Sequence, residues 1–326
     1  IDPNIGKVPL PDSRLIELNK IVNSKRIIPA ALDLVDIAGL VKGASDGEGL
    51  GNAFLSNIRE MTALAHVVRC FEDQNITHVD GSVNPKRDVE VINLELILSD
   101  LETVTKRIAK CEKLIKTNDK NNKIQLEILL LIQKDLENGQ LINLKNFTED
   151  EQKIIKSFQL LSSKPMFFIG NINDSEQSKK YIEQLNEVAK ELNTFVIPVS
   201  IKIEHEISTL EEEEKKEYLE VMGLDEPILN KIILEGYKML GLKTFFTAGP
   251  NEIRAWTIKD GFTAPNAAGV IHTDFERGFI KAEVIDFKDY IANGGELGAK
   301  ENGKLRLEGK EYIVQDGDVI HFKFNV

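Results

Sequence analysis

The chain has 326 residues, too many for one compact core, so two or three domains are expected. Hydrophobic residues make up 42% of it and charged residues 29%, which is typical of a soluble globular protein. The net charge of −12 argues against broad, non-specific binding to nucleic acid, and no apolar run approaches the ~20 residues that span a bilayer, so we expect no membrane contact.

Strands and helices alternate through most of the first 240 residues, apart from one long helical stretch. The strands are expected at 6–10, 30–37, 65–71, 166–171 and 195–200, and the helices at 13–22, 51–64, 175–192 and 227–240. Such alternation predicts an α/β fold with a mostly parallel sheet and right-handed connections. Two isolated cysteines, Cys70 and Cys111, lack metal-ligand spacing and favour a reducing compartment over a disulfide framework or a zinc site.

A heptad repeat interrupts this pattern from Val89 onward. Apolar residues recur every seven positions in two interleaved series: Leu94, Leu101, Ile108 and Ile115, with Ile97, Val104 and Cys111. This spacing predicts one strand of a coiled coil. A polar turn at 117–122 and an apolar helix at 124–136 then predict a helical hairpin inserted into the α/β domain. Such an arm can serve as a partner surface or as a stable insertion.

After Gly241, short alternating segments indicate a separate α+β domain of about 85 residues. Strands are expected at 244–248, 252–258, 279–285 and 318–324, and short helices at 264–271 and 287–292. Trp256 is consistent either with the core of this domain or with a stacking surface.

The main chemical signal lies between Leu34 and Gly51. An apolar strand ends at Asp36, Gly39 follows three residues later, and further glycines crowd the next dozen positions. In nucleoside triphosphatases such an aspartate holds the Mg²⁺ shell, usually through water, and such a glycine brings its N–H near the γ-phosphate. The pattern favours a nucleotide switch over a strand followed by a flexible loop, because catalytic loops tend to follow strand C-termini.

Two further strand ends carry candidate base-binding residues, because ligands of parallel sheets bind beyond the C-terminal ends of the strands. The candidates are Asn171, Ile172, Asp174, Ser200, Ile201 and Lys202. Guanine-specific proteins carry Asn-Lys-x-Asp at the first of these ends. Here Ile172 replaces the lysine; its apolar side chain can stack on a purine, but guanine specificity loses support. The three residues from Ser200 are expected to line the base with backbone groups.

Several runs of residues carry a resemblance to a known family. They are Ile1 to Asn4, Val35 to Ala44, Gly47 to Asn52, His66 to Glu72, His78 to Val83, Phe246 to Gly249, Arg254 to Thr257, Ile271 to Glu276 and Asp316 to Asp318. Through them nearly the whole chain resembles the YchF/Obg-like ATPases, a P-loop family related to translation factors.

The resemblance implies a P-loop-type α/β domain over 1–86 and 163–240, a coiled-coil arm over 87–162, and a ubiquitin-like TGS domain over 241–326. It also implies a cytoplasmic protein that binds and slowly hydrolyses ATP to ADP with Mg²⁺. The implied partner is the ribosome, through its large subunit, with RNA contacts from the TGS domain and the arm. The family motif has Glu at the position where this chain has Asp174. Aspartate is the residue that guanine-specific proteins carry there, so the choice between ATP and GTP stays open.

A phosphate-binding Gly-x-x-x-x-Gly-Lys-Ser/Thr run does not occur in the sequence, although a triphosphatase needs one. The resemblance implies that Ile1 directly follows the switch threonine, and that a segment of roughly 35 residues with the phosphate loop precedes it. We therefore expect the 326-residue chain by itself to bind triphosphate poorly and to be inactive.

Leu40 stands where many GTPases carry the glutamine that orients the attacking water, and leucine cannot bind water. The catalytic set is therefore expected to comprise Gly39, Leu40 and a polar group from elsewhere. His78, in the loop after the strand at 65–71, is the candidate, and the resemblance supports a loop histidine in this role. The alternative is that His78 caps a turn. His66, within the strand, is expected to be a satisfied core histidine.

Three functions are consistent with these features: an ATPase switch on ribosomes, a GTPase of the same fold, and a non-enzymatic ribosome-binding scaffold with a residual nucleotide site. Base selectivity distinguishes the first two. Ribosome binding that survives the loss of hydrolysis indicates the third.

Overall fold

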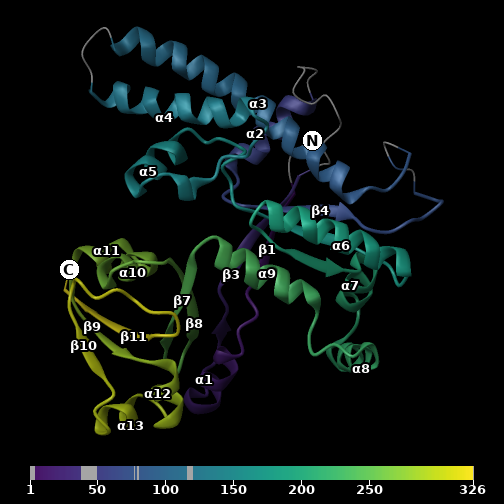
Figure 1. The fold of residues 1–326 in the computed structure, drawn as a ribbon. Helices are drawn as coiled ribbons and strands as arrows, with labels where there is room; N and C mark the ends of the chain where they lie inside the picture. The colour runs from purple at the N-terminus through teal and green to yellow at the C-terminus, as the bar shows by residue number, and fades with distance from the viewer. Residues whose placement is uncertain (1–3, 38–49, 77, 79–80, 116–119, 326) are drawn as a thin grey trace. The chain divides into compact units, whose positions relative to one another are not determined.

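The structure is a computed structural model that describes residues 4–37, 50–76, 78, 81–115 and 120–325 (Figure 1). The chain packs as two compact units. The first comprises Ile1–Asn4 and Asp36–Met222, and the second comprises Ile5–Val35 and Gly223–Val326. The division into a nucleotide-binding domain, an arm and a TGS domain stays a prediction.

The first unit contains a parallel sheet of three strands, β4 (Leu64–Arg69), β5 (Met166–Asn171) and β6 (Val196–Val199), with β5 in the middle. Helix α6 (Glu176–Glu191) and the start of α3 (Pro85–Ile115) pack on it through Phe168, Tyr181 and Leu185. Helix α2 (Leu50–Glu60) packs with α3 in a separate cluster around Leu55 and Leu96. The expectation of an α/β fold with a parallel sheet is confirmed.

Strand β3 (Ala31–Asp36) pairs with β1 (Asn4–Pro9) in a two-stranded sheet. Within the described residues it does not pair with β4, although the sequence predicts one sheet for both. The expectation of a buried strand also fails, because Leu32 alone of the six residues of β3 is buried and Leu34 is 39% exposed. An apolar run indicates a strand, but burial depends on which elements cover each face.

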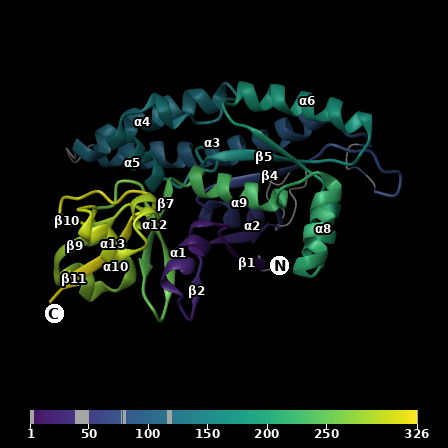
Figure 2. The same ribbon diagram turned by 90° about the horizontal axis from the view of Figure 1, so that it is seen from below.

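The predicted helical hairpin is formed by α3 (Pro85–Ile115) and α4 (Lys120–Glu137), which lie side by side in both ribbon views (Figures 1 and 2). Val104 and Ile97 of the heptad series are buried against Leu129 and Ile132 of α4, whereas Leu94 is 51% exposed. The short helix α5 (Glu149–Ser157), which the sequence analysis does not predict, closes this cluster.

A buried carboxylate joins α3 to the segment that leads into β5. Asp100 is fully buried, and its oxygens accept hydrogen bonds from the backbone N–H groups of Leu161 (2.9 Å) and Ser162 (2.7 Å) and from the Ser162 hydroxyl (2.7 Å). Burial raises the pKa of Asp100, although these hydrogen bonds oppose the shift. The remaining described helices of this unit are α7 (Ile201–Ser208), α8 (Glu212–Met222) and a short 3-10 helix at Leu144–Asn146.

The second unit is built on a six-stranded sheet in the order β10-β9-β11-β7-β8-β2. Its strands are β2 (Ile27–Ile28), β7 (Leu242–Ala248), β8 (Ile253–Lys259), β9 (Phe279–Ile285), β10 (Arg306–Glu308) and β11 (Val319–Phe324). Its helices are α1 (Arg14–Val22), α9 (Ile228–Met239), α10 (Ala264–Ile271), α11 (Thr273–Arg277), α12 (Phe287–Ala292) and α13 (Glu296–Glu301).

Two hydrophobic clusters cover the two faces of this sheet. Phe245 and Phe322 pack with α10 on one face. Phe246 and Val319 pack with α1, α9 and α12 on the other, together with Leu18. The side chains of the neighbouring residues Phe245 and Phe246 therefore lie on opposite faces of the sheet, as those of successive strand residues do. Of the described helices, none is both long and apolar enough to cross a membrane.

Candidate functional site

The C-terminal ends of β4, β5 and β6 lie at one edge of the parallel sheet, and Asn171 ends the middle strand. The ladder continues just past the strands, since Cys70 donates its N–H to the Asn171 carbonyl (2.8 Å) and Ile172 donates its N–H to Val199 (2.9 Å). The two base-binding segments predicted from the sequence are thus adjacent in space.

A side-chain hydrogen bond joins these two segments. Oδ1 of Asn171 accepts the backbone N–H of Ile201 at 3.2 Å. Ser200 begins α7 as its N-cap, and its hydroxyl accepts the N–H of Ile203 at 3.4 Å. Because the carboxamide oxygen of Asn171 is held in this way, the direction of its Nδ2 group is fixed. Among the described residues, Nδ2 has no hydrogen-bond partner.

Ile172 and Asp174 differ in their surroundings. Ile172 is half-buried and packs against the core cluster that contains Phe168 and Leu185. Asp174 is exposed at the tip of the loop, as are Ile201 and Lys202 at the start of α7.

Asn173 organises the loop that carries Asp174, a role that the sequence analysis misses. Its Oδ1 accepts hydrogen bonds from the hydroxyls of Ser175 (2.6 Å) and Ser178 (2.7 Å) and from the Ser175 N–H (3.1 Å). Ser175 in turn caps α6. The available signal was Asn followed by Ser at two and five residues, a pattern typical of a capped turn.

His78 lies beside the first turn of α3. Its Nε2 is 3.0 Å from Oδ2 of Asp88, and both side chains are largely buried, at 15% and 19% exposure. Arg87 also donates to Asp88, from its Nε (3.2 Å) and its Nη2 (3.0 Å). The carbonyl of His78 accepts the N–H of Gly81 (3.0 Å), so the backbone takes part in a turn while the ring is held by a carboxylate.

Arg69, at the end of β4, holds the segment that leads to His78. Its guanidinium donates to the carbonyls of Phe71 (3.0 Å), Asp73 (3.3 Å) and Ile76 (3.1 Å) and lies 4.9 Å from the centre of the Phe71 ring. This role of Arg69 could not be predicted, because carbonyl partners leave no mark in the sequence.

Two titratable side chains come from β4 and the residue that follows it, the half-buried His66 and the buried Cys70. Burial lowers the pKa of His66 to about 4 and raises that of Cys70 to about 12, and Asp88 acts electrostatically on both. The Nδ1 atom of His66 is buried with no hydrogen-bond partner among the described residues, so the expectation of a satisfied core histidine is wrong.

Asp36 ends β3 and is exposed. Gly39 and Leu40, the other switch residues predicted from the sequence, lie outside the described residues. Among the described residues no hydrogen bond or ion pair joins Asp36, His78 and Asn171 to one another. The structure thus brings together the two segments that the sequence predicts to bind the base, and it assigns His78 a carboxylate partner.

Comparison with known proteins gives consistent matches. A family model named YchF-GTPase_C and described as "Protein of unknown function (DUF933)" matches residues 242–325. The ribosome-binding ATPase YchF of Bacillus subtilis (strain 168) is 52% identical over 330 residues, covering 100% of this chain and 90% of that protein.

The protein of the same name from Escherichia coli O157:H7 is 50% identical over 327 residues with the same coverage. The solved structure of the Schizosaccharomyces pombe YchF GTPase superposes with a TM-score of 0.85 at 36% identity, covering 99% of this chain and 88% of that one. From this identity over the whole chain, together with the fold, it follows that the chain belongs to the YchF family.

Proposed function

We propose that this protein binds ATP, hydrolyses it slowly to ADP, and acts on the ribosome in the cytoplasm. The proposal is supported by relatives named ribosome-binding ATPase that match the chain over its full length. The proposed preference for adenine rests on one observation, the hydrogen bond between Asn171 Oδ1 and the Ile201 N–H.

This hydrogen bond favours adenine for a geometric reason. An asparagine reads adenine by accepting from N6–H₂ and donating to N7, whereas guanine offers two acceptors, O6 and N7, at the same positions. Oδ1 of Asn171 must keep facing the Ile201 N–H, because a flipped carboxamide would set two donors against each other. The free lone pair of Oδ1 and the Nδ2 donor then match adenine, with Ile172 holding the loop through its core packing.

Asp36 is the residue that would hold Mg²⁺ through water. Its carboxylate is exposed, is a hard oxygen donor of the kind that Mg²⁺ prefers, and has no ion-pair partner among the described residues. When bound, the ion would neutralise charge on the phosphates. His78, held by Asp88, would orient the attacking water or stabilise charge on the phosphate, together with Gly39 and Leu40 of the switch segment.

In this proposal residues 1–86 and 163–240 bind the nucleotide, and the arm (87–162) and the TGS domain (241–326) contact the large ribosomal subunit and its RNA. Leu130 and Leu131, which are 48% and 56% exposed on α4, offer an apolar surface on the arm.

The test is calorimetric titration of the full-length protein with ADP and GDP separately. ADP is expected to bind at least ~10-fold more tightly, which corresponds to ~1.4 kcal/mol. Asn171→Asp keeps an acceptor for Ile201 but replaces the Nδ2 donor, so it should remove most of this difference. Lys180→Ala, at an exposed residue of α6 outside the candidate site, serves as the control and should leave ADP binding unchanged.

GTP is the second candidate substrate, because the matching solved structure is titled a GTPase and Asp174 is the residue that guanine-specific sites use. Tighter binding of GDP, with a loss of GDP affinity in Asp174→Ala, would replace ATP by GTP. Two results together would support the scaffold instead. The unaltered protein would show no hydrolysis, and the His78→Ala variant would still sediment with ribosomes.

A further inference from the structure

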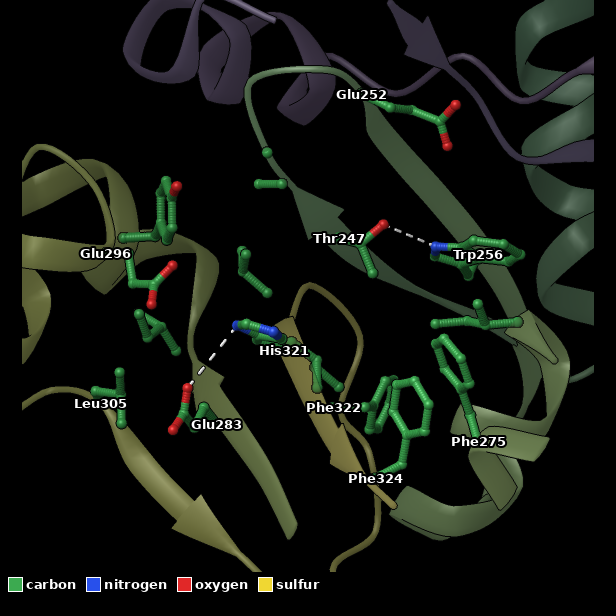
Figure 3. Close-up of a pocket in the computed structure, with 17 residues that line it drawn as sticks. Thr247, Glu252, Trp256, Phe275, Glu283, Glu296, Leu305, His321, Phe322 and Phe324 are labelled. Atoms are coloured by element: carbon green, nitrogen blue, oxygen red, sulfur yellow. Dashed lines mark hydrogen bonds and ion pairs between the residues drawn. The ribbon is translucent and has the colours of Figure 1, made fainter. Parts of the chain in front are cut away.

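A cavity of about 390 Å³ opens in the C-terminal part of the chain, between strands β7 and β11 (Figure 3). Its lining comes from residues 247–324, so it shares no residue with the candidate nucleotide site. Its volume lies in the range of ligand pockets.

The cavity exists because two neighbouring strands diverge. β7 and β11 are in register at one pair, Phe246 and Val319. In contrast, β11 pairs with β9 over its whole length, from Val319 to Phe324. Beyond Ile320, the edge of β11 that faces β7 is therefore outside any strand ladder among the described residues. Such an edge presents the N–H and C=O groups of every second residue.

Two chemically different walls meet along β11, because successive side chains of a strand point to opposite faces. One wall is aromatic and includes Trp256, Phe322, and the rings of Phe275 and Phe324, which stack at 3.8 Å. The Trp256 Nε1 is occupied by a hydrogen bond to the Thr247 hydroxyl (2.9 Å).

The other wall is acidic and carries Glu283 of β9, Glu296 of α13 and His321 of β11 (Figure 3). The sheet register places Glu283 directly opposite His321, and one ligand atom from each of the three side chains lies within 4.8 Å of the others.

The acidic wall already attracts a cation from the chain itself. Nζ of Lys323 lies 3.3 Å from Oε2 of Glu283 and 3.4 Å from Nδ1 of His321. Glu296 has no ion-pair partner among the described residues, and Glu252, which also lines the cavity, has only Arg254 at 4.0 Å. The wall therefore carries more negative than positive charge and has the geometry to seat an ammonium group.

We propose that this cavity binds a basic peptide segment of a partner protein in an extended conformation. The peptide backbone pairs with the open edge of β11, a lysine or arginine side chain reaches Glu296 and Glu283, and an apolar neighbour lies on the aromatic wall. The alternation of the two walls thus selects alternating basic and apolar residues. The carboxylates repel phosphate, so RNA is not the occupant of this face.

Trp256 is the single tryptophan of the protein and lines the cavity, so its fluorescence reports binding to the full chain directly. The probe is a hexapeptide with blocked termini that alternates lysine and valine. The reference peptide has the same composition with three lysines followed by three valines. We expect the alternating peptide to bind at least ~10-fold more tightly, because it alone fits both walls.

Two substitutions with opposite expected effects separate a binding role from a folding defect. Glu296→Gln should weaken binding ~10-fold, whereas Lys323→Met, which removes the competing ammonium, should tighten it ~3-fold. Glu301→Gln, an exposed residue of the same helix as Glu296, is the matched control and should have no effect.

Equal affinity for both peptides, or unchanged binding in Glu296→Gln, would overturn the proposal. So would Zn²⁺ or spermidine alone changing Trp256 fluorescence with an affinity equal to that of the alternating peptide, since the cavity would then be a site for free cations.

Discussion

At the scale of single residues, Asp88 is the polar centre of the region around His78. It contacts His78 and Arg87 directly, and its charge acts on His66 and Cys70. A carboxylate on one ring nitrogen of a histidine restricts the tautomer and the orientation of the ring.

The first prediction concerns this pair. Asp88→Asn should lower the kcat of ATP hydrolysis ~10-fold with little change in KM, because the ring of His78 loses its orientation. His78→Ala should lower kcat ~100-fold. Since both residues act through one group, the double variant should be no slower than His78→Ala in steady-state assays of the full-length protein. Additive losses would contradict a shared role.

The second prediction follows from the lowered pKa of His66. The native ring stays neutral down to about pH 4, whereas the unfolded chain takes up a proton below its ordinary value of 6.5. The unfolded state therefore binds more protons, so stability must fall as the pH is lowered from 6.5 to 4. Between pH 7 and pH 5 this histidine should account for a loss of about 2 kcal/mol.

Urea unfolding followed by far-ultraviolet circular dichroism at the two pH values measures this loss. His66→Phe should remove most of the pH dependence, and His205→Asn, an exposed histidine of the same unit, should not. An unchanged slope in His66→Phe would show that another group titrates.

At the scale of elements, α4 shows that the contribution of a leucine to stability depends on its position on the helix. Leu129 is fully buried in the arm, whereas Leu130 is 48% exposed. Leu129→Ala should destabilise the arm by about 3 kcal/mol through the lost burial and the cavity left behind. Leu130→Ala should cost less than ~0.5 kcal/mol. Urea midpoints of the two variants give the comparison, and equal midpoints would mean that α3 and α4 do not pack in solution as described.

Several elements could be predicted from the sequence because their signal is local. The strands 166–171 and 279–285 and the helices 264–271 and 287–292 appear with the expected bounds. Helix α5 was missed, although its capping box of Thr148 and Glu151 is legible in the sequence. The strand β2 has two residues and exists because Ile27 and Ile28 pair with β8, from the other end of the chain.

In the candidate site too, features with a local sequence signal could be predicted and features that depend on tertiary contacts could not. The strand ends at Asn171 and Ser200 were predictable because parallel strands bring their C-termini to one edge. The bond from Ile201 to Asn171 and the pairing of His78 with Asp88 were not, since each depends on the conformation of an irregular segment. Periodicity carries no information about such segments.

At the scale of the whole molecule, the candidate nucleotide residues belong to one unit and Trp256 to the other. ADP at a hundred times its dissociation constant should stabilise the unit that contains these candidate residues by ~2.7 kcal/mol in the full-length protein. The unfolding transition reported by Trp256 fluorescence should shift less than the transition reported by hydrogen exchange at β5. Equal shifts would show that the two units unfold together.

The second unit is assembled from two pieces of chain, 5–35 and 223–326, which fixes the timing of its folding during synthesis. Leu15, Leu18 and Leu32 emerge from the ribosome before their packing partner Ile233, which is translated roughly 200 residues later. At ~5–20 residues per second, these leucines wait roughly 10 to 40 s without their native neighbours. The nascent chain therefore carries an apolar, chaperone-accessible segment for most of its translation, while the inserted unit can already fold.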